Sequence, residues 1–168
     1  MHTVARSILW ALLVTAGSSV SQVALACPDY QLNGEQVTYS SDQLYTPVRH
    51  TLTAGGDQNL TSCTEPGSGW ITRQPDFTFR LTGNSARRML QFRTQANCDT
   101  VLLVNTPSAS WRFDDDGGDG LNAKIDFLQA AEGIYDIWVG TSGPEGCRAT
   151  LVAETFGNGS TSPAKRSR

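Results

Sequence analysis

Val101-Leu102-Leu103-Val104 is apolar at every position, and a few residues earlier Met89-Leu90-Gln91-Phe92-Arg93 alternates apolar with polar side chains. Alternation with a period of two is typical of a strand that buries one face. A short run that is apolar on both faces is typical of a strand at the centre of a core. The first stretch therefore decides the fold, because it predicts a fully buried strand at 100–105 around which the rest of the chain packs.

Seven further runs rich in β-branched and aromatic residues stand between turn-forming residues such as Gly83-Asn84-Ser85 and Gly143-Pro144. No run after the first 26 residues has the period of a long helix. Without helices to make parallel crossovers, the pattern predicts an all-β fold, an antiparallel β-sandwich or jelly roll with about eight strands. The seven further strands are predicted at 48–53, 77–81, 89–94, 110–114, 124–128, 134–139 and 148–156.

The first 26 residues have the three parts of a cleavable signal peptide: a positive charge at Arg6, an apolar run at 8–16 and small residues up to Ala26. The run is shorter than the ~20 residues that span a bilayer, so no transmembrane segment is predicted. Cleavage after Ala26 would leave Cys27 first, but the bulky Leu25 stands in the wrong place for a lipoprotein signal. We therefore expect a freely periplasmic or secreted protein rather than a lipid-anchored one.

Residues 27–156 are expected to form one sandwich domain, followed by a flexible Gly/Ser/Pro-rich tail at 157–168. The chain has 13 Lys and Arg against 16 Asp and Glu, a net charge of −3. Removing the signal takes away Arg6 and no acid, so the mature domain is slightly more acidic. An acidic surface repels phosphate backbones, which argues against nucleic acid as a partner.

The chain contains four cysteines, and an even number of cysteines in an exported protein predicts two disulfide bonds. Three connectivities are possible. We favour Cys27 with Cys63 and Cys98 with Cys147, because each pair then joins segments that flank strands. A bond across the ~50 residues between the last two would contribute about 4 kcal/mol in the chain-entropy description.

The densest group of polar ligand atoms is Asp114-Asp115-Asp116-Gly117-Gly118-Asp119-Gly120-Leu121-Asn122, between two predicted strands. Four carboxylates this close repel one another unless solvent or a cation compensates them, and hard oxygen ligands suit Ca²⁺. An EF-hand loop is ruled out, because Gly118 and Ile125 occupy its fifth and twelfth positions. The alternative is a solvated Asp/Gly turn that binds nothing.

The segment from Cys98 to Phe156 resembles the bacterial pre-peptidase C-terminal (PPC-like) β-sandwich domains. The likeness is carried by Cys98-Asp99-Thr100-Val101-Leu102-Leu103-Val104-Asn105-Thr106-Pro107, by Trp111-Arg112-Phe113-Asp114-Asp115-Asp116 and by Gly133-Ile134-Tyr135-Asp136-Ile137-Trp138-Val139-Gly140-Thr141. The resemblance implies a jelly-roll sandwich that accompanies exported proteins and binds extracellular polymers. It also implies calcium ligands, which fall in this chain on Asp114, Asp115, Asp116, Asp119 and Asn122.

Binding is a more economical function than catalysis for this sequence. His50 is the only histidine after the predicted cleavage site, and it lies in an alternating run where a packing or surface role is common. No GxSxG nucleophile motif occurs. The alternative function is a small secreted hydrolase that uses His50 or the acidic loop.

Trp70, Trp111 and Trp138 are candidates for stacking against a ligand, although tryptophans of this kind are also core residues. Asp136 shares a strand face with Trp138, which indicates that this face is not wholly buried. The sequence thus predicts an exported, non-catalytic binding or accessory module, stabilised by Ca²⁺, whose partner is an unidentified extracellular or envelope polymer or protein.

Overall fold

The computed structural model describes residues 27–157, so the predicted signal peptide and positions 158–168 of the predicted tail lie outside the described residues. No helix in the described part is long and apolar enough to cross a membrane. The elements are β1 (Glu35–Ser40), η1 (Gln43–Tyr45), β2 (Val48–Ala54), β3 (Gln58–Asn59), η2 (Leu60–Ser62), β4 (Trp70–Ile71), β5 (Phe77–Thr82), β6 (Met89–Ala96), β7 (Thr100–Asn105), β8 (Trp111–Asp114), β9 (Lys124–Phe127), β10 (Gly133–Thr141) and β11 (Cys147–Phe156).

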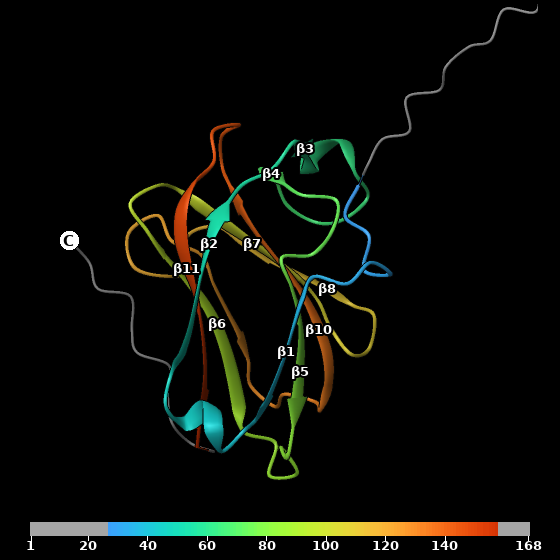
Figure 1. Ribbon diagram of the computed structural model, residues 1–168, viewed down its shortest axis with the longest axis vertical. Coiled ribbons are helices and arrows are strands. Elements are labelled where there is room, and N and C mark those ends of the chain that lie inside the picture. Colours follow the sequence, from blue (N-terminus) through green and yellow to red (C-terminus); the bar gives the residue numbers. More distant parts are fainter. Residues whose placement is uncertain (1–26, 158–168) are drawn as a thin grey trace, which may run out of the picture.

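The strands form two sheets that face each other (Figure 1). The first sheet has the order β1-β5-β10-β7-β8, with the short strands β4 and β3 continuing beside the end of β10. The second has the order β2-β11-β6-β9. All eight predicted strands are present, and the predicted all-β sandwich is confirmed.

The sandwich differs from the expected one at its N-terminal end. β1, β3 and β4 have no counterpart among the predicted strands, and β1 pairs with β5 in parallel. Glu35–Ser40 lacks a clean apolar pattern, because half of its side chains are exposed at the sheet edge. A crossover from β1 through β2, β3 and β4 makes the parallel pair possible without any long helix.

The main core fills the space between the sheets. Phe79, Phe92 and Tyr135 contribute its largest side chains, with Phe79 and Phe92 in an edge-to-face contact at 5.0 Å between ring centroids. Leu44 of η1 is fully buried and closes one end of this core. Burial of apolar surface on this scale is the main force that holds the two sheets together.

The first sheet is buried on its outer face as well. Val101 and Leu103 of β7 pack there with Trp138 of β10, while their neighbours Leu102 and Val104 face the main core. The segment from Leu60 to Ile71 covers this second core. The expectation of a central strand at 100–105 is therefore confirmed, since all six of its residues are buried.

A row of polar residues crosses the outer face next to this second core. Asp136 is only 7% exposed and accepts a hydrogen bond of 2.9 Å from the Thr78 hydroxyl, which in turn accepts from the amide of Gly34. This face is closed at Trp138 and Asp136, but Ile134 on the same face is half-buried and lines a surface pocket with Thr78 and Arg80, so the face is partly open at that end, as expected. Asp136 itself is no sign of exposure, because it is a buried carboxyl satisfied by a hydroxyl.

Both favoured disulfides are present. Cys27–Cys63 joins the start of the described chain to the loop that covers the second core, and Cys98–Cys147 joins the β6–β7 turn to the start of β11. No described cysteine is free. The first bond fixes the N-terminal segment over the sheet, where Tyr30 packs edge-on against Trp111.

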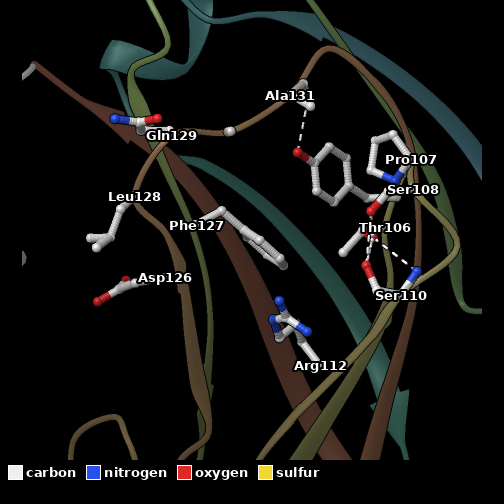
Figure 2. A pocket seen from close by; sticks show the side chains of 12 residues that line it. Thr106, Pro107, Ser108, Ser110, Arg112, Asp126, Phe127, Leu128, Gln129 and Ala131 are labelled. Atoms are coloured by element: carbon white, nitrogen blue, oxygen red, sulfur yellow. Dashed lines mark hydrogen bonds between the residues drawn. The ribbon is translucent and has the colours of Figure 1, made fainter.

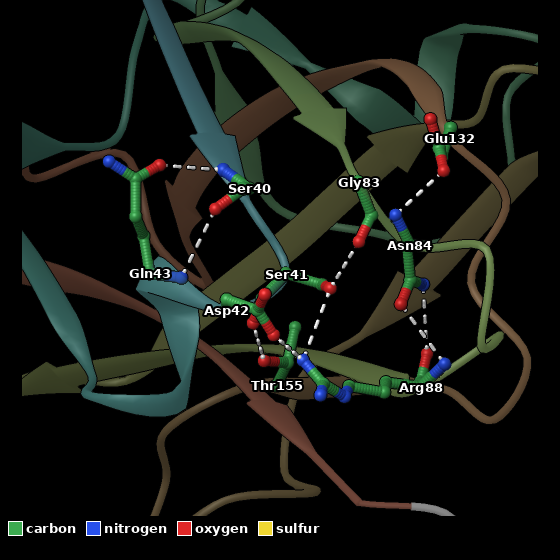
Figure 3. Close-up of polar contacts among 9 residues, drawn as sticks. All are labelled: Ser40, Ser41, Asp42, Gln43, Gly83, Asn84, Arg88, Glu132 and Thr155. Carbon is green, nitrogen blue, oxygen red and sulfur yellow. Dashed lines mark hydrogen bonds and ion pairs between the residues drawn. The ribbon is translucent and has the colours of Figure 1, made fainter.

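A polar cluster holds the end of the sandwich at which β5 meets β6 (Figure 3). Asn84 is 1% exposed, and its side-chain amide donates to the carbonyls of Arg88 and Ala130 and accepts from the backbone amide of Arg88. The backbone amide of Asn84 donates to the Glu132 carboxylate. Arg88 forms an ion pair with Asp42. Because these groups satisfy one another, the cluster is structural, and it fixes the loop before β10.

Asp76 completes the pairing of β10 where its neighbour changes from β5 to β4. The carboxylate accepts a hydrogen bond of 2.7 Å from the amide of Val139, whose carbonyl accepts from the amide of Gly55. Burial raises the pKa of Asp76 from 3.8 to about 7, although the Val139 amide acts in the opposite direction. The carboxyl therefore binds its proton more tightly in the folded protein than in the unfolded chain.

This difference predicts the pH dependence of stability. A raised folded-state pKa contributes stability that is complete below pH ~4 and is lost as the pH rises to about 7. The Asp76→Asn variant keeps an acceptor for Val139 and cannot titrate. We expect denaturant titrations at pH 5 and pH 8 to differ less for Asp76→Asn than for the unmodified protein. Equal differences for the two proteins would contradict this account of Asp76.

Candidate functional site

The two sheets separate between β8 and β9, and the edge of the sandwich stays open there. Each strand has four residues and ends its sheet. The gap forms a pocket of about 290 Å³ (Figure 2). Its lining residues come from the β7–β8 turn, from β8, from β9, from the following loop and from β10: Thr106, Pro107, Ser108, Ser110, Arg112, Asp126, Phe127, Leu128, Gln129, Ala130, Ala131 and Tyr135.

Two aromatic rings form the apolar floor of the pocket. Phe127 is half-buried and meets Tyr135 edge-on, with 5.2 Å between ring centroids. The Tyr135 hydroxyl donates a hydrogen bond of 2.8 Å to the carbonyl of Ala131. Burial raises the pKa of Tyr135 to about 12, so the phenol stays protonated at neutral pH. Leu128 beside the floor is 74% exposed, which leaves apolar surface open to a ligand.

Three hydroxyls form a closed ring at one wall. The oxygens of Thr106, Ser108 and Ser110 lie 2.8–3.1 Å apart, and the Ser110 amide also donates to the Thr106 hydroxyl. The β7–β8 turn brings them together, because Ala109 takes a left-handed conformation with φ of 55°. Each hydroxyl can donate or accept, so the ring can bond to either kind of ligand atom.

Arg112 supplies the positive charge of the pocket. β8 pairs with β7 so that Arg112 lies opposite Val104, whose side chain faces the main core, and Arg112 therefore points into the gap between the sheets. The Arg112 guanidinium donates a hydrogen bond of 3.0 Å to the carbonyl of Trp111. Ion pairs among the described residues use Arg73, Arg88 and Arg93 but not Arg112.

The opposite rim carries Asp126 and the loop after β9. Asp126 points away from the main core and accepts a hydrogen bond of 2.7 Å from the Gln91 side chain. Gly133 shapes the loop, because its φ is 137° and a Cβ there would lie 2.8 Å from Pro107. The polar cluster around Asn84 holds the same loop through Ala130. Figure 2 shows the hydroxyl ring on one side, Asp126 and Leu128 on the other, and Phe127 with Arg112 between them.

The predicted calcium loop connects the two walls of this pocket. Two of its predicted ligands, Asp114 and Asn122, form hydrogen bonds to backbone groups. One Asp114 oxygen accepts hydrogen bonds from the amides of Gly117 at 2.7 Å and Lys124 at 2.8 Å. The Asn122 side chain bonds to both backbone groups of Ala96. These contacts shape the loop whether or not an ion is present.

Asp115, Asp116 and Asp119 are exposed in the same loop. Within residues 27–157, the only group of three His, Cys, Asp or Glu side chains whose ligand atoms lie within 4.8 Å of one another is Cys27, Cys63 and Glu65, and the two cysteines are joined in a disulfide. The structure therefore does not bring three loop carboxylates together. Calcium binding at Asp114, Asp115, Asp116, Asp119 and Asn122 stays a prediction.

The other predicted site residues lie away from the pocket or below the surface. His50 sits at the opposite edge of the sandwich, where its Nε2 is 3.2 Å from the Tyr39 hydroxyl and its ring packs on Phe77. Trp138 is fully buried and packs against the half-buried Trp111, with 5.3 Å between ring centroids. Trp70 is half-buried in β4. Ligand stacking on Trp70 or Trp111 stays a prediction.

Sequence reasoning missed the pocket residues, although a signal for one of them exists. Arg112 and Asp114 alternate with Trp111 and Phe113 in β8, and the two polar side chains face the space between the sheets. A polar residue at an inward position of a strand marks an edge that is not sealed. The hydroxyl-rich turn at 106–110 carries no such signal, because serine and threonine are common in turns of every kind.

No protein-family model, no curated protein and no solved structure matches this chain. The resemblance to PPC-like domains therefore stays a prediction.

The double role of Asp114 as an acceptor gives a prediction that does not depend on metal. Asp114→Ala leaves two amides without their acceptor, which costs about 1–3 kcal/mol for each buried group that stays unsatisfied. We expect a clear loss of unfolding free energy in a denaturant titration of Asp114→Ala. The matched variant Asp115→Ala should change it by less than ~0.5 kcal/mol, as is usual for an exposed position. Similar losses in both variants would contradict the structural role of Asp114.

Proposed function

We propose that the chain is an exported, non-catalytic binding module that holds part of its ligand in the pocket at the β8–β9 edge. The observation that carries the proposal is Arg112, an arginine on the inward side of an edge strand with no carboxylate partner among the described residues. A few convergent polar groups around an apolar floor are the usual make-up of a ligand pocket. The size of about 290 Å³ suits one ring or one side chain of a larger ligand.

Two features support binding over hydrolysis. The hydroxyls of Thr106, Ser108 and Ser110 bond to one another, and their recorded partners include no base that could activate them. His50, the only histidine after position 2, lies at the opposite edge of the sandwich. The hydrolase alternative would need a reacting group that converges with His50, and the partners of its ring are Tyr39 and Phe77.

Export and calcium enter the proposal as supporting roles. Two disulfides suit an oxidising compartment such as the periplasm or the extracellular medium. The acidic loop runs directly from β8 to β9, so an ion bound there would fix the two walls of the pocket relative to each other. In this view Ca²⁺ acts on the pocket through its walls and does not touch the ligand.

Calcium stabilisation has a direct test. We expect millimolar Ca²⁺ to raise the midpoint of thermal unfolding relative to chelator, because an ion bound only by the folded loop stabilises the fold. The shift should disappear in Asp115→Asn with Asp119→Asn and persist in Asp57→Asn, an exposed acid in another loop. An unchanged midpoint in the unmodified protein would remove calcium from the proposal.

The pocket itself is tested by fragment binding followed by NMR. We expect small sugars, amino acids and dipeptides that bind to shift the amide signals of 106–112 and 126–131. Ser108→Trp places a large side chain at the exposed rim and should abolish those shifts, whereas Ser142→Trp in the exposed turn after β10, at the other end of that strand from Tyr135, should not. Shifts that cluster elsewhere, or that survive Ser108→Trp, would overturn the location of the site.

A further inference from the structure

We propose that the pocket at the β8–β9 edge binds a carboxylated sugar, with Arg112 pairing the carboxylate, the three-hydroxyl ring bonding to sugar hydroxyls and Phe127 contacting the sugar ring. The inference rests on the proposed function and names the ligand class for the same site. It is drawn from three properties of the lining: its charge, its hydrogen-bonding groups and its apolar floor.

The charge of the pocket favours a ligand that carries a single negative group. A guanidinium pairs with a planar carboxylate through two parallel hydrogen bonds. Arg112 forms no ion pair with the other described residues, so no ion pair is broken when it binds a ligand carboxylate. The same lining contains Asp126, and the whole chain has a net charge of −3. Repulsion from these acids grows with the charge of the ligand, so a densely charged phosphate polymer is repelled more strongly than a sugar with a single carboxylate.

The hydrogen-bonding groups match a ligand that is rich in hydroxyls. Each member of the ring formed by Thr106, Ser108 and Ser110 can exchange a bond to its neighbour for a bond to a ligand oxygen, as donor or as acceptor. Gln129 is exposed at the opposite rim, where its side-chain amide can donate or accept further hydrogen bonds. A sugar presents several hydroxyls along one edge, so it can bond to more than one member of the ring at once, which a single peptide side chain cannot do.

The floor distinguishes a sugar from a small, fully polar anion. Phe127 is half-buried against Tyr135 and Leu128 is 74% exposed, so a ligand must cover apolar surface to gain from this site. A sugar ring has a face of C–H groups that can pack on an aromatic ring while its edge carries hydroxyls and the carboxylate. Acetate or inorganic phosphate would use Arg112 and leave the floor exposed to water.

The test compares two ligands with the same sugar framework, one with charged carboxylates and one with neutral methyl esters. We expect tri-galacturonic acid to shift the NMR signals of 106–112 and 126–131 and to bind at least about tenfold more tightly than its fully methyl-esterified form, which has lost the carboxylate charges. Sialyllactose, whose sugar carries a carboxylate of a different geometry, distinguishes uronic acids from other acidic sugars. Each titration is repeated with chelator, because a calcium bridge between ligand and acidic loop could otherwise replace Arg112.

Two variants assign the preference to Arg112. Arg112→Gln should bind the acid and the ester equally, with a loss of about tenfold for the acid. Arg80→Gln removes an exposed arginine on the other side of the first sheet and should keep the full preference. Circular dichroism shows whether each variant is folded.

The outcomes distinguish the preference for a carboxylated sugar from the binding function of the pocket. Neutral sugars or amino acids that bind in the pocket without any preference for the acid would overturn the inference and leave the binding function standing. A preference that survives Arg112→Gln would also overturn it. No binding by any probe would overturn both the ligand class and the pocket.

Discussion

Burial of the first sheet on both faces is the constraint on which the rest of the structure depends. β7 and β10 place large apolar side chains on each side, so two layers must cover them. The second sheet covers one side. The other side receives the N-terminal segment and the loop from Leu60 to Ile71, which contain too few apolar residues to form an independent core and are joined by Cys27–Cys63.

The same constraint explains where the sandwich is open. Strands that cover the second core keep β10 and β7 away from solvent, and at the β1–β2 side Tyr39, His50 and Phe77 close the space between the sheets with ring contacts. At the β8–β9 side no further strand follows among the described residues, and a polar arginine stands where a core residue would complete the seal. A binding surface at this gap removes few apolar contacts from the interior, so it lowers the stability of the fold little.

The fold could be read from the sequence because its signals are local. Alternation around Phe92 and the apolar run at Val101 identify strands without any knowledge of their neighbours, and eight strands were placed in this way. β1 could not be predicted in this way, because an edge strand with exposed side chains has no such pattern. The burial of Asp136 is unpredictable for a related reason, since alternation assigns a side chain to a face but cannot say what lies over that face.

The site was less predictable because its parts are distant in sequence. Arg112 and Phe127 belong to different sheets, and the hydroxyl ring depends on the geometry of one turn. The composition of the acidic loop predicts a calcium site, whereas in the structure Asp114 and Asn122 form hydrogen bonds to backbone groups. Composition reports which groups are present, but only pairing between strands decides which of them meet.

The pattern of the disulfides has a consequence for how the protein matures. Each cysteine is bonded to the next one along the chain, first with second and third with fourth. Under the proposed export, a chain that crosses a membrane N-terminus first can close Cys27–Cys63 before Cys98 and Cys147 emerge, which leaves those two as the remaining pair. Oxidation in this order gives the native bonds directly, without the help of a disulfide isomerase.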